Sequence, residues 1–454
     1  MDSVPCFLDS PVERVLDPVS ETDEISDVLI AEGEIKAIGS PLRDIPQEAA
    51  ALDCQGFVLA PGLVDLYSHN SEPGNEDRET LSTLVAAAAA GGFTRLGILP
   101  DTVPPVDNPG SLAWLQQRSR GAGEAEGKTD QSFSFAPGHL GTSSLLTPHS
   151  SLPHPPHLHF WGALTLGVKG EQMTELAELA TAGVIGFADG HPVENLGLLR
   201  RLLEYLAPLE KPVALVAAES DLRGNGVMRE GVRSLRSGLP GDPTMSESAA
   251  LAALLEVVAA TRTPVHLMRI STARGVELIA DAKARGLPVT ASTTWMHLLL
   301  NAEAVGSYDP NLRLEPPLGD RADQLALSEG VKHGVIDTIT VDHTPYTYEE
   351  KTVAFADAPP GAIGLELALP LLWQTFVETG EWSALQLWRA LSIAPQKCLQ
   401  QKPTSCAVGK TAELVLFDPQ KNWIVQRNTL HSASANTPWF GKELTGKVVK
   451  IWMG

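Results

Sequence analysis

The sequence predicts an α/β protein, an eight-stranded parallel β/α barrel with a small β domain built from both ends of the chain. Short β-rich runs recur eight times in the middle of the chain, and helix-like stretches separate most of them. Strand-like segments without helices occupy the first sixty residues and the last fifty. Strands that alternate with helices form parallel sheets, so a barrel is expected, with an open doubly wound sheet as the alternative.

Both ends of the chain read as β structure. Residues 25–39 (ISDVLIAEGEIKAIG) contain two β-rich runs joined at Glu32-Gly33, which indicates a hairpin. The closing segments AELVLFD, NWIVQ and GKVVKIWMG are also strand-like. We predict that residues 1–60 and 401–454 build one small β domain beside a barrel of residues 61–400. Two independent terminal caps are the alternative.

The barrel strands are expected where β-rich residues cluster, at 63–68, 94–99, 158–164, 184–188, 212–218, 264–270, 288–293 and 337–342. The helix-like stretch 79–92 ends in glycines that suit a left-handed cap. Another begins with Thr244 and Glu247, the spacing of a capping box. A third, residues 275–286, has apolar residues three and four apart, the stripe that packs on a sheet.

Residues 120–157 interrupt this alternation. The segment is rich in Gly, Ser and Pro and has no periodicity, which predicts a mobile surface insertion. The segment holds His139, His149 and His154, and His157 and His159 come just after, so five of the twelve histidines fall within 21 residues. A metal-binding tract is one interpretation, but the irregular spacing favours a solvated loop.

Charge and cysteine content limit the functional classes. The 55 acidic and 34 basic residues give a net charge of -21, which argues against nucleic acid or an anionic membrane as partner and leaves room for a basic protein. Four scattered cysteines are too few for a disulfide framework, so we expect a reducing cytoplasm. The N-terminal residues do not resemble a signal peptide, and the apolar run at 84–92 is too short to cross a bilayer.

Candidate site residues follow the predicted strands, because such barrels place their sites at the carboxyl ends of the strands. A hydrolytic metal needs three or more nitrogen or oxygen ligands and an open position for water. Four residues at strand ends meet that count: His69, Asp189, His297 and Asp342. The alternative is that the histidines are hydrogen-bonded at a polar rim while Asp342 caps a loop. Arg269 ends the sixth strand. The sequence has no phosphate-binding glycine loop, nucleophile elbow or paired-cysteine zinc signature.

Ordered motifs along nearly the whole chain resemble one family. They begin with PGLVDLYSHNSEPGNEDRETLSTLVAAAAAGGFTRLGILPDTVPPVDN and continue through ALTLGVKGEQMTELAELATAG, ISTARGVELIADAKARGLPVTA, GVIDTITVDHTPY and NTPWFGKELTGKVVKIWMG. The chain is similar to dihydroorotase, of the amidohydrolase superfamily. This resemblance implies an amidohydrolase-type barrel. It also implies a zinc-bound hydroxide that interconverts carbamoyl aspartate and dihydroorotate in de novo pyrimidine biosynthesis.

The resemblance also implies a degenerate zinc site. Asp342, the family's ligand and general base, is retained, and the acidic bridging position falls on Ala188 or Asp189. A thioether is a poor ligand for a hydroxide-bearing ion, and a methyl group is none. Three metal-ligand histidines of the family are replaced here, by Tyr67 (paired with His69), Ala217 and Met296 (paired with His297).

The family's substrate anchors are replaced as well. Ser71 stands for the arginine that grips the substrate carboxylate, and Tyr346 stands for a histidine. Asp101 stands for an asparagine and would repel an anionic substrate, favouring a cationic or neutral one. The resemblance therefore favours an inactive pseudoenzyme that is a structural or regulatory partner of aspartate transcarbamoylase. We also expect a homo- or hetero-oligomer.

Two other functions stay open on the sequence alone. One is an active dihydroorotase or other cyclic amide hydrolase, which would use zinc on a reduced site of His69, Asp189, His297 and Asp342, with Asp342 as the base. The other is a small-molecule-binding module in the old pocket.

Overall fold

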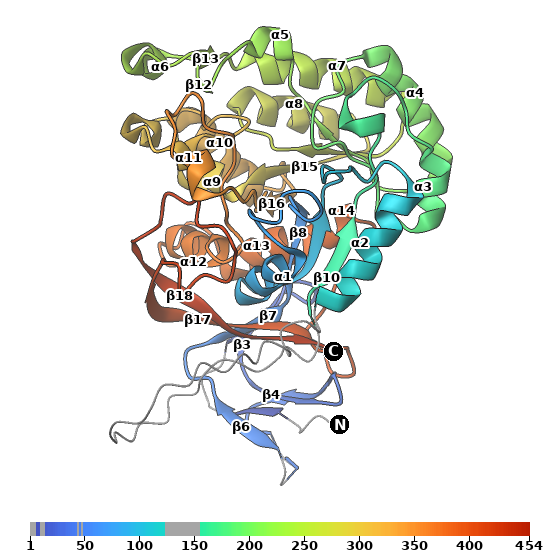
Figure 1. Ribbon diagram of the computed structural model, residues 1–454. Helices are drawn as coiled ribbons and strands as arrows, with labels where there is room; N and C mark the ends of the chain where they lie inside the picture. The colour runs from blue at the N-terminus through green and yellow to red at the C-terminus, as the bar shows by residue number, and fades with distance from the viewer. Residues whose placement is uncertain (1–5, 10–13, 43–44, 47–48, 123–154) are drawn as a thin grey trace, which may run out of the picture.

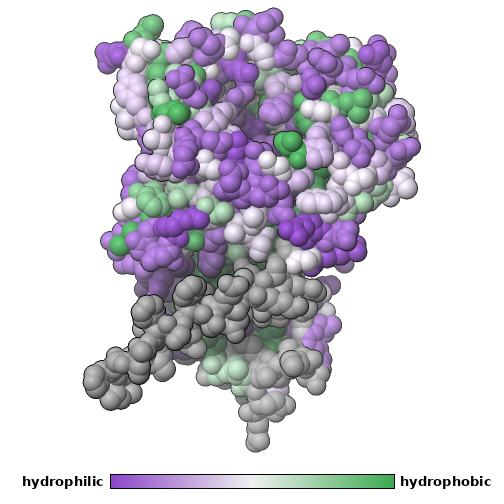
Figure 2. All heavy atoms as spheres, viewed as in Figure 1, coloured by the Kyte–Doolittle hydropathy of each residue, from purple (hydrophilic) through white to green (hydrophobic). Residues whose placement is uncertain are grey.

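The computed structural model describes residues 6–9, 14–42, 45–46, 49–122 and 155–454. Most of the predicted insertion, residues 123–154 with His139, His149 and His154, lies outside the described residues. A helix-covered barrel forms the upper part of the molecule, and sheets drawn from both ends of the chain lie below it (Figure 1). Polar side chains cover most of the face in view, in keeping with the charge of -21 (Figure 2).

The predicted barrel is confirmed. Its strands form two parallel groups, β8 (Leu63–Ser68), β9 (Phe93–Ile98) and β10 (His157–Phe160), then β11 (Ala214–Val216), β14 (Val265–Met268), β15 (Val289–Thr294) and β16 (Thr338–Thr340). The predicted fourth strand, 184–188, contributes only bridges from Phe187 to Gly162 and Val213, which link the groups. The barrel closes where the His69 amide donates to the His343 carbonyl at 2.9 Å.

Most of the helices around these strands pack through a buried apolar face: α8, for example, buries Ile279 and Ala282, three residues apart. None of the described helices is long and apolar enough to cross a membrane. The longer helices are α1 (Leu81–Ala90), α2 (Pro109–Ala122), α3 (Leu176–Ala182), α4 (Leu196–Leu206), α7 (Met245–Thr261), α8 (Ala273–Ala284) and α10 (Arg321–Lys332). The shorter ones are α5 (Ser220–Arg223), α6 (Val232–Ser237), α9 (Trp295–Leu299), α11 (Tyr348–Lys351), α12 (Ala368–Leu372), α13 (Ala384–Trp388) and α14 (Ala394–Cys398).

The predicted left-handed glycine after α1 is confirmed, whereas the predicted capping box at the start of α7 is wrong. Gly92, just after α1, adopts the predicted left-handed conformation, with φ of 84°. At α7, Thr244 makes no side-chain cap. Its expected partner, Glu247, instead accepts hydrogen bonds from the backbone and hydroxyl groups of Ser271 and Thr272. Four donors from a distant loop outcompete the local cap.

Both termini contribute to one small β domain, as predicted. Its five-stranded sheet has the order β18-β17-β7-β2-β3, in which β7 pairs with N-terminal β2 on one side and C-terminal β17 on the other. A four-stranded sheet has the order β5-β4-β1-β6, and β4 and β5 turn at Glu32 and Gly33, both with positive φ. The strands are β1 (Cys6–Asp9), β2 (Arg14–Asp17), β3 (Thr22–Ile25), β4 (Asp27–Ala31), β5 (Glu34–Gly39), β6 (Ala50–Asp53), β7 (Val58–Pro61), β17 (Glu413–Ile424) and β18 (Glu443–Met453).

Candidate functional site

A cavity of about 240 Å³ opens at the carboxyl ends of the barrel strands, the position expected for a site in this fold. Residues that follow most of the strands line it, among them His69, Asp101, His191, Ala217, Arg269, Met296, His297 and Asp342. Two very short strands after β11, β12 (Met228–Arg229) and β13 (Gly241–Asp242), add Arg229 and Asp242 to the wall. The wall of the cavity therefore combines charged and apolar side chains that come from distant parts of the chain.

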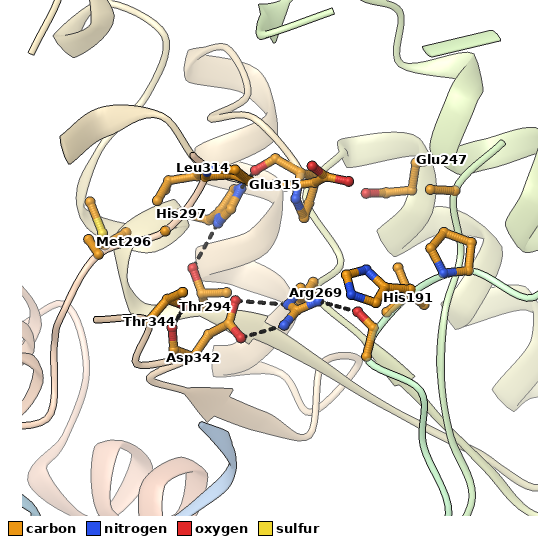
Figure 3. Close-up of a pocket in the computed structure, with 18 of the residues that line it drawn as sticks. His191, Glu247, Arg269, Thr294, Met296, His297, Leu314, Glu315, Asp342 and Thr344 are labelled. Atoms are coloured by element: carbon orange, nitrogen blue, oxygen red, sulfur yellow. Dashed lines mark hydrogen bonds and ion pairs between the residues drawn. The ribbon is translucent and has the colours of Figure 1, made fainter. Parts of the chain in front are cut away.

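A buried ion pair between Arg269 and Asp342 lies at the base of this site. Arg269 donates from Nε and Nη2 to the two carboxylate oxygens at 2.8 and 2.6 Å, and from Nη1 to the Gly190 carbonyl at 2.7 Å. Figure 3 shows the guanidinium facing Asp342, with His191 on its other side. Bidentate pairing of this kind is the strongest form of the interaction and fixes both side chains in orientation.

The backbone at both partners is strained. Arg269 and Asp342 have φ of 54° and 55°, the left-handed region that non-glycine residues avoid. Each such residue costs on the order of 1–3 kcal/mol and persists only where its surroundings determine the conformation. Here the end of a barrel strand and the ion pair together hold each residue in place.

His69 has no nitrogen available to a metal. Its Nδ1 lies 2.5 Å from Asp101 Oδ2, and its Nε2 lies 3.5 Å from Asp342 Oδ1 and 3.2 Å from Arg269 Nη2. Burial lowers the pKa of His69, but the carboxylates of Asp101 and Asp342 outweigh it and raise the pKa to about 9. The protonated ring has no lone pair. In the neutral ring, with Nδ1 donating to Asp101, Nε2 would accept from Arg269.

Tyr67 fills the space between β8 and β14. The side chain is fully buried, and its hydroxyl accepts a hydrogen bond from the Arg269 amide at 3.1 Å and bonds Ser292 Oγ at 2.8 Å. Its ring faces the Arg269 guanidinium with 5.4 Å between ring centre and Cζ, a cation–π contact. Burial raises the pKa of Tyr67 to about 12, so it stays a neutral phenol that supports the arginine.

His297 lines the cavity but is held by other groups. Its Nδ1 accepts from the Thr294 hydroxyl at 2.8 Å, and its Nε2 donates to the Pro316 carbonyl at 3.1 Å. Burial lowers the pKa of His297 to about 4, so the ring is neutral at pH 7. Met296 and Ala217 also line the cavity and offer only a thioether and a methyl group.

Asp189 lies apart from the other candidate residues and, within the described chain, does not line the cavity. Its carboxylate accepts from the amides of Leu164 and Thr165 at 2.7 and 3.1 Å, and from the Thr165 hydroxyl at 2.5 Å. Burial raises its pKa to about 6. Asp189 therefore orders the loop after β10.

Two of the three residues at the family's substrate-anchor positions line the cavity, and the third does not. Asp101 and Tyr346 line the cavity, whereas Ser71 is buried and its carbonyl accepts from the Asn75 amide at 2.7 Å. The Tyr346 ring is flanked by the cations of Arg78 and Lys351, at 4.9 and 5.1 Å from the ring centre.

These side chains do not fit a catalytic zinc. Across the described residues, no group of three or more His, Cys, Asp or Glu side chains is arranged to hold a metal ion. Only two of the four candidates, His69 and Asp342, face one another, and the Arg269 guanidinium binds between them. A metal would have to displace a fixed cation from Asp342.

The role of Arg269 could not be assigned from the sequence, which only placed it at the end of the sixth strand. One signal was available: a single arginine closing an apolar strand (PVHLMRI) requires a buried acidic partner. The sequence does not show which acid supplies it, because Asp342 lies 73 residues away.

The closed barrel, its cavity at the strand ends and the sheet from both termini define an amidohydrolase-type fold. An L-hydantoinase structure from Arthrobacter aurescens has this fold, with a TM-score of 0.80 at 20% identity, covering 100% of this chain and 95% of that one. A family model described as "Dihydro-orotase-like" matches residues 56–128.

Two relatives match over almost their full length. A "Probable dihydroorotase-like protein" of Synechocystis is 48% identical, covering 97% of this chain and 98% of its own. A "Dihydroorotase" of Pelobacter propionicus is 35% identical, covering 96% and 95%. The chain belongs to the dihydroorotase-like family.

Proposed function

We propose that this chain is a dihydroorotase-like protein of pyrimidine biosynthesis that has lost metal-dependent catalysis and acts as a structural or regulatory partner of aspartate transcarbamoylase. The observation that carries the loss of catalysis is the bidentate pair in which Arg269 occupies both oxygens of Asp342. Asp342, which corresponds to the family's metal ligand and general base, is thereby bound to the guanidinium of Arg269.

The pair also removes the basicity that hydrolysis requires. Burial would raise the pKa of Asp342, but Arg269 and His69 outweigh it and hold that pKa well below its ordinary value. A general base works best when its pKa is near the working pH. A carboxylate that stays ionised even in acid is therefore a poor acceptor for a proton from water.

Hydrolysis of dihydroorotate, measured with and without added zinc, tests the loss of catalysis. We expect no turnover above the uncatalysed rate in either condition, with the dihydroorotase of Pelobacter propionicus as the active control. The Tyr67→His variant should also remain inactive, because the other replaced positions and the Arg269–Asp342 pair persist. Zinc-dependent turnover by the unmodified protein or by this variant would contradict the proposal.

Two observations support the partnership with aspartate transcarbamoylase. The fold is intact although the side chains at its strand ends do not fit a metal. The charge of -21 favours a partner whose surface carries the opposite field. Sedimentation velocity of the two purified proteins from one organism, alone and mixed, tests this part. A faster-sedimenting species in the mixture, weakened by salt, is expected; independent sedimentation at low salt would contradict it.

A further inference from the structure

Two short helices, α6 and α11, have their apolar side chains on the solvent side. Of the six residues of α6 only Ser234 is buried, whereas Val232 and Leu235, three residues apart, are 64% and 83% exposed. In α11 the buried residue is Lys351, whereas Tyr348 is 79% exposed. A surface helix normally turns its apolar side chains toward the core. Both helices therefore present apolar side chains to something outside the chain's own core.

Hydrogen bonds of the buried polar residues hold the two helices in this orientation. The Ser234 hydroxyl donates to the Gly231 carbonyl at 2.9 Å and accepts from the Gly231 amide at 3.0 Å. The Lys351 ammonium donates to the carbonyls of Pro310 and Pro359 at 3.1 and 2.7 Å. Turning either helix over would break these bonds and leave buried carbonyl oxygens without a donor, which is costly. The outward apolar faces are therefore fixed by the fold.

The two helices belong to one patch, because the loop 303–310 contacts both. The hydroxyl of Tyr308, itself exposed, donates to the carbonyl of Ser237 at the end of α6 at 2.8 Å, and the Pro310 carbonyl accepts from Lys351 of α11. Both helices lie at the upper left of the barrel (Figure 1), where apolar surface is visible (Figure 2). Contiguous exposed apolar residues mark interaction sites, and tyrosine is enriched there. We call this surface the rim patch, made of Val232, Leu235, Tyr308 and Tyr348.

The charges around the rim patch indicate which kind of surface can cover it. Residues 230–238, 303–310 and 347–357 carry more acids than bases, and one of the bases, Lys351, is buried. A second copy docked through the same patch on a twofold axis would bring like charges together. A partner with basic residues around an apolar centre would complement the patch instead. The acids are Glu230, Glu303, Asp309, Glu349, Glu350 and Asp357, and the bases are Arg233, Arg236 and Lys351.

We propose that the rim patch is the docking surface for a protein partner whose own contact surface has an apolar centre bordered by lysine and arginine. Leu235 and Tyr348 enter the apolar centre of the partner, and exposed carboxylates such as Glu230 and Glu349 face its basic border. The inference rests on the proposed function, in which this partner is aspartate transcarbamoylase, and it adds the surface and the chemistry of the contact.

Sedimentation velocity of the full chain titrated with aspartate transcarbamoylase from the same organism tests this docking surface. Leu235→Asp should weaken binding by at least about 30-fold, the size of effect expected when a central apolar contact is lost. Glu349→Lys should weaken binding by about 3- to 10-fold and make it less sensitive to salt, because it puts a cation opposite the basic border. Both side chains are exposed, so the thermal midpoint of each variant should match that of the unmodified protein.

The matched controls lie on α4, which is on the opposite side of the barrel from α6 (Figure 1). Leu196→Asp makes the same change as Leu235→Asp at another exposed leucine of a helix. Glu204→Lys makes the same change of charge as Glu349→Lys at another exposed glutamate. Both controls should bind as the unmodified protein does, because neither residue belongs to the rim patch.

The possible failures are distinguishable. A complex that forms equally well with Leu235→Asp would overturn the docking surface while the proposed partnership stands. The absence of any complex with the unmodified protein would contradict the partnership and, with it, the surface assigned to it. Self-association of the unmodified protein that is lost in Leu235→Asp would show that a second copy covers the rim patch, which also overturns the inference.

Discussion

Arg269 and Arg229 line the same cavity and are buried to a similar degree, yet their surroundings differ. Every nitrogen of the Arg269 guanidinium donates a hydrogen bond, to Asp342 or to the Gly190 carbonyl. Arg229 donates to described residues from only one of its three nitrogens. The difference teaches that burial alone does not decide how completely an arginine is hydrogen-bonded: Arg269 has a bidentate carboxylate partner, whereas Arg229 has only a longer contact with Asp242.

The largest expected effect comes from removing the satisfied arginine. Arg269→Met leaves the Asp342 carboxylate buried without its partner, and breaking a buried pair in this way costs about 3–5 kcal/mol. Urea unfolding should show this loss in the free energy of unfolding. Arg274→Met is the matched control, because its exposed pair with Glu277 should contribute at most about 0.5 kcal/mol. Equal stability of the two variants would remove the distinction between Arg269 and an ordinary surface arginine.

The pH dependence of stability tests the charge cluster beside Arg269. The pKa of His69 in the folded protein is about 9, above its ordinary value of 6.5. A raised folded-state pKa contributes stability that is fully present below pH 6.5 and is lost as the pH rises through 9. The loss amounts to at most about 3 kcal/mol. Urea midpoints are measured from pH 6 to 10 for the unmodified protein and for His69→Asn, because Lys351, whose pKa is lowered to about 7, changes stability in the opposite direction over this range. The stability of the unmodified protein relative to the variant should fall as the pH rises. A difference between the two proteins that stays constant from pH 6 to 10 would contradict the cluster.

Removing the unsatisfied arginine should cost less than removing Arg269. Arg229→Met loses the hydrogen bonds to Ser271 and Pro317 and leaves the buried Asp242 without its cation. The contact with Asp242, at 3.4 Å, is longer than the bidentate contacts of Arg269, so the cost should be about 2–3 kcal/mol. Urea unfolding of this variant, measured beside Arg269→Met, gives the comparison directly. A loss as large as that of Arg269→Met would show that Arg229 is equally part of the structure.

Tyr67→Phe should have a smaller effect. The substitution keeps the ring that faces Arg269 and removes only the hydroxyl that bonds Ser292 and the Arg269 amide, at a cost of about 1 kcal/mol. Thermal unfolding followed by circular dichroism measures this shift. A stabilised Tyr67→Phe variant would contradict the supporting role of the hydroxyl.

The sequence predicted the barrel well because its strands are recognisable locally. The run 63–68 is a strand with the predicted bounds, β8, and the hairpin turns at Glu32-Gly33 as expected. The run 184–188 has the same β-rich composition but forms only isolated bridges through Phe187. Composition indicates that a segment can join a sheet. The number of its residues that pair depends on the neighbouring segments, here those of Gly162 and Val213.

The candidate site was less predictable because its bonds join distant residues. His69 and Asp342 were expected to lie together, and the structure places their side chains 3.5 Å apart. The orientation of Asp189 toward Leu164 and Thr165 depends on a loop path that no local pattern specifies. Arg269 had no assigned role for the same reason, since its partners lie 73, 79 and 200 residues away.

The zinc content of the purified protein tests the central claim most directly, namely that the Arg269 guanidinium takes the place of a metal at Asp342. Expression in zinc-supplemented medium, dialysis against metal-free buffer and elemental analysis should give far less than one zinc per chain. Added zinc should leave the thermal midpoint unchanged. One or more zinc ions per chain retained through dialysis, with a midpoint that falls when a chelator removes them, would contradict the account.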